Sequence, residues 1–195
     1  PMEQIRVCTH DRPGAKPVIR TVPWPEVGKK AALIKVGACG VCGTDLHILK
    51  GHWPKPLPWP FTLGHELGGV IVECCPEFTE DFMSKPLKVG SKVMIPPLMP
   101  CSRCYYCIHY PQSANKCLTP VYCGRDPGFD KAPHMWGGWA EYVYVYVDLD
   151  GGGGRDGDED GEVDHRAMAR IGRVRSLFLL QCPQGNSGRV LPIML

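Results

Sequence analysis

Short runs of apolar and β-branched residues, separated by glycine and proline, recur along the first 147 residues. Four of these runs have the length of a strand and end at turn-forming residues: AALIKVG (31–37), GGVIVE (68–73), SKVMI (91–95) and AEYVYVYV (140–147). In the last run tyrosine alternates with valine, which predicts one aromatic and one aliphatic face. No part of this region keeps a helical period for more than about two turns. The pattern predicts a mainly β domain, a barrel or a sandwich.

The pattern changes after residue 147. Residues 148–164 contain eight acidic side chains, six glycines and one arginine, and the segment that follows is basic. So few apolar groups cannot offset the entropy of ordering the chain. We therefore expect an ordered domain over 1–147 and a largely disordered tail over 148–195.

Composition excludes several classes of protein. Apolar residues make up 44% of the chain, which is enough for a core, and the net charge of +2 does not favour nucleic acid or an anionic membrane as partner. We find no signal-peptide pattern and no apolar run long enough to span a bilayer. The sequence predicts a soluble, cytoplasmic protein, and in a reducing cytosol its eleven cysteines should be free thiols or metal ligands.

Four cysteines fall within seventeen residues of a lobe that we place at 96–123. Their spacing is C-x2-C-x2-C-x9-C, formed by Cys101, Cys104, Cys107 and Cys117. Tight two-residue turns let thiolates converge on one tetrahedral Zn²⁺, and a closed four-thiolate site stabilises structure without performing chemistry. Iron–sulfur clusters use related spacings and are the chemical rival, but the Cys-Pro signature is missing. We predict a structural zinc site.

A second group of motifs lies upstream. GACGVCGTDLHILKG (37–51) is followed by LGHELGG (63–69), then by the cysteine lobe, and then by GGWAEYV (137–143). This order resembles that of the zinc-containing medium-chain alcohol dehydrogenases and their sorbitol and threonine dehydrogenase relatives. The resemblance covers residues 5–147 approximately. It implies a GroES-like, partly open β-barrel with short helices and a zinc-binding lobe.

The resemblance also implies roles for individual residues. Cys42 and His65 match catalytic zinc ligands, and Glu66 matches the carboxylate that approaches the metal. Asp45 matches the acid that orients the ligands. Thr44 falls where the family places the hydroxyl that contacts the substrate, and His47 where several members place the outer end of a proton relay.

The activity implied is that of an oxidoreductase acting on a small alcohol or polyol. In the family the alcohol binds an open zinc position, forms an alkoxide, and passes hydride to NAD or NADP held by a separate Rossmann domain. The resemblance is also compatible with a homo-oligomeric assembly of the full-length relatives. The resemblance implies neither a nucleic-acid nor a membrane partner.

The chain departs from the family beyond residue 147. The third catalytic ligand of the family, a Cys or Glu, has no counterpart with the right surroundings, so neither Glu162 nor Cys182 is assigned. The glycines Gly152, Gly154 and Gly157 satisfy G-x-G-x-x-G, but acidic residues follow where pyrophosphate would sit. We therefore expect a truncated chain that lacks the cofactor domain and is inactive by itself. The alternative is a non-catalytic zinc-binding structural or interaction module.

Overall fold

The structure is a computed structural model that describes residues 4–28, 31–76, 79–81, 85–101, 104–110, 113–124, 128–146 and 180–181. The acidic run, the glycine fingerprint, Glu162 and Cys182 lie outside these residues. None of the described helices is long enough and apolar enough to cross a membrane.

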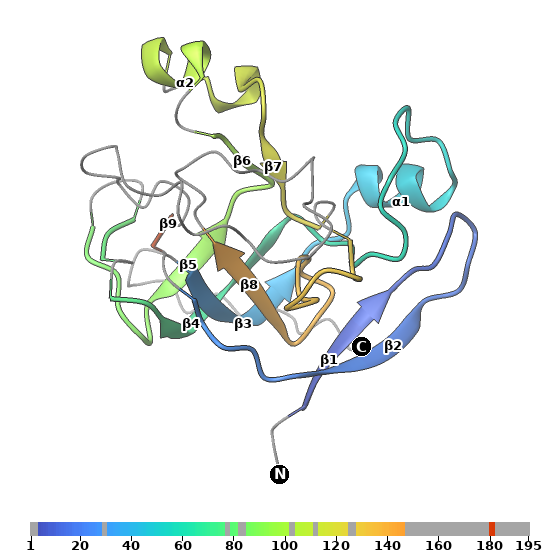
Figure 1. The fold of residues 1–195 in the computed structure, drawn as a ribbon, viewed down its shortest axis with the longest axis horizontal. Coiled ribbons are helices and arrows are strands. Elements are labelled where there is room, and N and C mark those ends of the chain that lie inside the picture. The colour runs from blue at the N-terminus through green and yellow to red at the C-terminus, as the bar shows by residue number, and fades with distance from the viewer. Residues whose placement is uncertain are drawn as a thin grey trace.

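A five-stranded antiparallel sheet forms the centre of the molecule (Figure 1). All four strands predicted from the sequence belong to it, which confirms those predictions. A two-residue strand from beyond residue 147 is added at one edge. The order across the sheet is β8 (Tyr142–Tyr146), β3 (Ala31–Cys39), β4 (Leu67–Cys74), β5 (Lys92–Ile95) and β9 (Leu180–Gln181).

Smaller elements surround the sheet. A hairpin of β1 (Gln4–Thr9) and β2 (Val18–Pro23) packs beside it, and helix α1 (Gly43–Leu49) follows β3. The short strands β6 (Leu98–Met99) and β7 (Val121–Tyr122) pair antiparallel. They lead into the lobe that carries α2 (Tyr105–His109) and η1 (Ala114–Lys116), which projects from the body in Figure 1. The prediction of a mainly β, GroES-like architecture is confirmed, and no pairing among the described strands closes the sheet into a barrel.

The first four residues of strand β3 are buried on both faces of the sheet. Ala32 and Ile34 pack in one apolar cluster with the neighbouring strands, while Leu33 between them packs in a second cluster with β1. The predicted two-faced character of β8 is also confirmed, because Val143 and Val145 join the first cluster, whereas Tyr142 and Tyr144 pack against the second. The central strand therefore holds both halves of the core together.

Glycine is required at position 64, immediately before His65. Its φ is +93°, a conformation that L side chains rarely adopt. A Cβ there would lie 2.5 Å from Cδ1 of Trp139 and 2.7 Å from Sγ of Cys39. Trp139 thus packs directly on the backbone that presents His65.

Replacing Gly64 with alanine should destabilise the domain more than replacing Gly90. Gly90 has a similar φ of +88° but nothing within 4 Å of a Cβ. Gly90→Ala should therefore cost about 1–3 kcal/mol of unfolding free energy from backbone strain alone, and Gly64→Ala about 1–3 kcal/mol more from overpacking. Urea unfolding of the two variants measures the difference. If both variants lose the same unfolding free energy, the contact between Gly64 and Trp139 is not tight.

Candidate metal centres

The four cysteines of the lobe come together in the structure. The Sγ atoms of Cys101, Cys104, Cys107 and Cys117 all lie within 4.8 Å of one another. Cys104 and Cys107 are 3.5 Å apart at sulfur, and Cys101 and Cys107 are 3.9 Å apart. A tetrahedral ion with Zn–S bonds of about 2.3 Å requires sulfurs about 3.8 Å apart. The spacing therefore fits a zinc ion, and it is far longer than the roughly 2 Å of a disulfide.

Backbone N–H groups point at these sulfurs. Cys101 donates to Sγ of Cys117 at 3.2 Å, and Cys104 donates to Sγ of Cys101 at 3.4 Å. A hydrogen bond from the backbone of Leu118 is the main cause that lowers the pKa of the Cys104 thiol, whereas burial raises the pKa of Cys117. Such N–H donors stabilise thiolates, the form that binds metal.

Strand pairing brings the second group together. Cys39 at the end of β3 pairs with Leu67 at the start of β4. The chain leaving β3 therefore runs beside the chain entering β4, and Gly40 N–H donates to the carbonyl of Glu66 at 2.7 Å. As a result, ligand atoms of Cys42, His65 and Glu66 lie within 4.8 Å of one another although the residues are far apart in sequence.

Helix α1 fixes the position of Cys42. Cys42 is the N-cap residue, with extended backbone (φ −90°, ψ 157°). Its N–H donates to Oδ2 of Asp45 at 2.9 Å, and Asp45 N–H donates to the Cys42 carbonyl at 3.1 Å. A carboxylate at this helical position satisfies an otherwise orphaned donor and favours the helix start. The same side chain therefore begins the helix and stands next to the metal-type ligands.

Asp45 also faces His65. Its side chain is fully buried, and Oδ1 lies 3.4 Å from Nδ1 of His65 with no closer hydrogen-bond partner. A buried carboxylate needs compensation. The contact engages Nδ1 and leaves Nε2 as the nitrogen for a metal, which is the arrangement that orients histidine ligands. The donor set and this unsatisfied oxygen both fit a bound cation.

The charge state of His65 follows from this contact. The contact with the Asp45 carboxylate is the largest of the causes that raise the pKa of His65 to about 9 in the metal-free protein. Only the neutral imidazole binds a metal ion. Below about pH 9, a metal entering this group must therefore displace a proton from His65.

Thr44, His47 and Cys39 lie near the second group of ligand-type residues in sequence. Thr44 is half-buried in the first turn of α1, and His47 is exposed one turn further along. Cys39, which forms a C-x2-C pair with Cys42, is buried, and burial raises the pKa of its thiol to about 12. A thiol of this kind is not suited to redox exchange. The sequence motifs did not reveal the N–H groups on the lobe sulfurs or the packing of Trp139 on Gly64, because both depend on tertiary structure.

The sheet and the projecting lobe are those of a GroES-like domain. Residues 28–149 match the family profile described as the alcohol dehydrogenase GroES-like domain. The chain belongs to this family.

Individual proteins and solved structures are similar to the chain. An alcohol dehydrogenase of Geobacillus stearothermophilus is 35% identical over 125 residues, which are 64% of this chain and 32% of that protein. The structure of an alcohol dehydrogenase from Thermotoga maritima matches with a TM-score of 0.68 at 23% identity, covering 74% of this chain and 39% of the other. A structure from Sinorhizobium meliloti, described as a zinc-binding dehydrogenase bound to NADP, matches with a TM-score of 0.57 at 31% identity, covering 74% and 37%. The chain thus spans about a third of the length of the curated relatives it matches.

Changing Cys104 to serine should release about one metal ion per chain and lower the melting temperature, because a local four-thiolate site contributes its binding energy to folding. Cys74→Ser is the matched control, since Cys74 lies in β4 outside both groups. Metal analysis and thermal unfolding measure both effects. Unchanged metal content and stability in Cys104→Ser would rule out a metal at the lobe.

Proposed function

We propose that residues 1–147 form the substrate-side, zinc-binding domain of an alcohol or polyol dehydrogenase. The observation that supports this most directly is the convergence of Cys42, His65 and Glu66 beside the buried carboxylate of Asp45. Three different donor types at one place, one of them exposed, are typical of a site that leaves a position open for substrate. The family uses zinc and NAD(P), and similar structures are described as holding NADP and NADH.

In this proposal each residue near the site has a separate task. Cys42 and His65 would hold the metal, and the exposed Glu66 carboxylate would be free to approach it when ligands exchange. Asp45 holds the imidazole of His65 in place. Zinc bound here would polarise the oxygen of the alcohol as a Lewis acid. Thr44 accepts the hydrogen bond of the alcohol, and the exposed His47 passes the proton on to solvent.

The lobe has a structural role in the same proposal. Its four thiolates fill all positions of a tetrahedral ion, so no position remains for substrate. We propose Zn²⁺ there as well, held by Cys101, Cys104, Cys107 and Cys117.

The four-cysteine group and the Cys42–His65–Glu66 group should differ in their affinity for zinc. A graded chelator titration should remove metal in two stages, because three mixed donors with an exposed carboxylate bind less tightly than four thiolates. Cys42→Ala should abolish only the first, weaker stage, and Cys104→Ser should abolish the second. Zinc release followed by a colorimetric indicator measures both stages. One tight stage that Cys42→Ala does not affect would count against a catalytic metal.

The 195-residue polypeptide by itself should neither bind NADH measurably nor oxidise alcohols. Hydride transfer needs the nicotinamide held about 3–3.5 Å from the substrate carbon, and the resemblance assigns that task to a separate domain. A fluorescence titration with NADH and an alcohol oxidation assay test this expectation. Micromolar binding that disappears when Gly154 is changed to a bulky residue would show that the glycine-rich segment is a nucleotide site.

A further inference from the structure

Helix α1 ends in a well-defined backbone motif. The N–H of Gly51 donates to the carbonyl of Ile48 at 2.9 Å, and the N–H of His52 donates to the carbonyl of His47 at 2.9 Å. Gly51 has a φ of +74°, the left-handed conformation that closes a helix in this way. The two hydrogen bonds together are those of a Schellman motif, which turns the chain back so that positions 47 and 52 lie side by side.

The two side chains that this motif brings together are both histidines. An apolar contact between these two positions often accompanies the motif in other helices. Here the imidazole rings of His47 and His52 have centroids 6.2 Å apart, with an angle of 43° between the ring planes. Both residues are exposed, and neither imidazole has a hydrogen bond or an ion pair with another described residue. Their ring nitrogens are therefore accessible to a ligand from solvent.

The separation of the rings suits one metal ion held by both. An imidazole nitrogen lies about 1.1 Å from its ring centre and binds Zn²⁺ at about 2.0–2.1 Å, so two rings on one ion have centres about 5.2 Å apart at a tetrahedral angle and about 6.4 Å apart on opposite sides of the ion. The observed 6.2 Å lies between these limits. Because both residues are exposed, small side-chain rotations can bring a nitrogen of each ring onto the ion without moving the core.

The surroundings determine which ions this pair can hold. No acidic residue lies between Asp45 and Glu66 in the sequence, and Asp45 itself is fully buried. The neighbouring Lys50 is exposed, so its ammonium group can point away into solvent. The ligands that this segment offers are thus neutral imidazoles and water. Such a set favours Ni²⁺, Cu²⁺ and Zn²⁺ over Mg²⁺ and Ca²⁺, which require oxygen ligands.

The histidine pair is separate from both candidate metal centres. Neither histidine belongs to the two groups whose ligand atoms lie within 4.8 Å of one another. Cys42 is the N-cap of α1, and His47 follows it by five residues. That spacing corresponds to about 7.5 Å along the helix axis and roughly 140° around it. An ion held by His47 and His52 is therefore not the ion of the Cys42 group.

We propose that His47 and His52 form a surface binding site for a divalent transition-metal ion of the nitrogen-preferring class, Ni²⁺, Cu²⁺ or Zn²⁺. The two imidazoles occupy two positions of the ion, and water fills the others. The site goes beyond the dehydrogenase function proposed above, and metal binding there does not depend on that function. If that function holds, the ion would occupy the imidazole to which the transfer of the proton to solvent is assigned.

The test is calorimetric titration of the full chain with Ni²⁺, after zinc has been loaded onto the cysteine groups and the excess removed. Ni²⁺ should bind in the micromolar range, and Mg²⁺ should not bind measurably. His47→Gln and His52→Gln should each weaken Ni²⁺ binding about tenfold or more, because the second imidazole no longer adds its intramolecular contact. His109→Gln, which removes an exposed histidine of α2, is the matched control and should have no effect.

Further measurements separate this site from the candidate catalytic group. Circular dichroism should show that both glutamine variants keep the fold, since both positions are exposed. Cys42→Ala should retain the Ni²⁺ binding that His52→Gln weakens. If instead Cys42→Ala removes the binding and His52→Gln does not, the ion is at the Cys42 group and the histidine pair is no site. Equal Ni²⁺ affinity of His52→Gln and the unchanged chain, or equal affinity for Mg²⁺ and Ni²⁺, would likewise refute the proposal.

Discussion

The antiparallel pairing of β3 with β4 is the constraint on which the rest of the molecule depends. It is the most extensive strand contact of the sheet, with partners from Ala32↔Cys74 to Cys39↔Leu67. It buries β3 between two apolar clusters, and at its end it places the segment before α1 beside the segment before β4. Because the candidate ligands Cys42 and His65 lie on these two segments, the register of the pairing sets the distance between them. A slip of one residue would also turn each side chain to the opposite face of the sheet.

The lobe depends on a different interaction. Helix α2 has no buried residue, and Tyr105, Ile108 and Leu118 are among the exposed large apolar side chains. Apolar burial therefore contributes little to holding this segment in place. In the described part of the lobe, the four sulfurs lie close together and two N–H groups point at them, alongside ring contacts among Tyr105, Tyr106 and Tyr110. The sheet is thus stabilised mainly by its apolar core, whereas the lobe depends on the cluster of cysteine sulfurs.

The sequence predicts the central sheet well because its strands carry strong local signals. The alternation of tyrosine and valine in β8, for example, corresponds directly to its two faces. Strand β2 gives no such signal, since Val18 and Ile19 are adjacent and both exposed. The short strands β6 and β7 have two residues each, too few for a period. Their pairing depends on the lobe between them.

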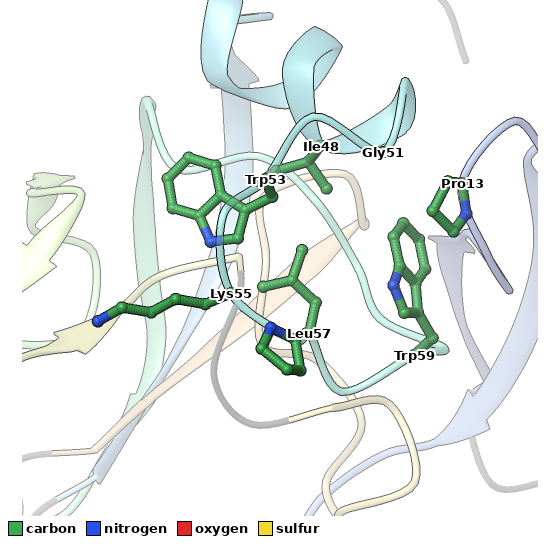
Figure 2. Close-up of a pocket in the computed structure, with 8 residues that line it drawn as sticks. Pro13, Ile48, Gly51, Trp53, Lys55, Leu57 and Trp59 are labelled. Carbon is green, nitrogen blue, oxygen red and sulfur yellow. The ribbon is translucent and has the colours of Figure 1, made fainter.

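The two candidate metal sites also differ in how far they can be predicted from the sequence. Cysteine spacing predicts the lobe cluster without knowledge of the fold, because its members are neighbours in sequence. The Cys42–His65–Glu66 group came from a resemblance, since spacing alone does not show that two distant segments of the chain meet. A pocket beside α1, lined by Ile48, Trp53, Leu57 and Trp59 among others (Figure 2), shows the same limit. The tryptophans at 53 and 59 are visible in the sequence, but the wall contributed by Pro13 comes from another part of the chain.

The different sequence separations within the two groups have a consequence for the order of folding. Residues 101–117 close a short loop, so the entropy lost when their thiols meet is small and the lobe can capture its metal early. Cys42 and His65 meet only after β3 and β4 have paired, so metal at that position requires a finished sheet. A metal ion bound in the lobe would therefore show only that the lobe itself has folded. A metal ion held by Cys42 and His65 would show that the whole domain has folded.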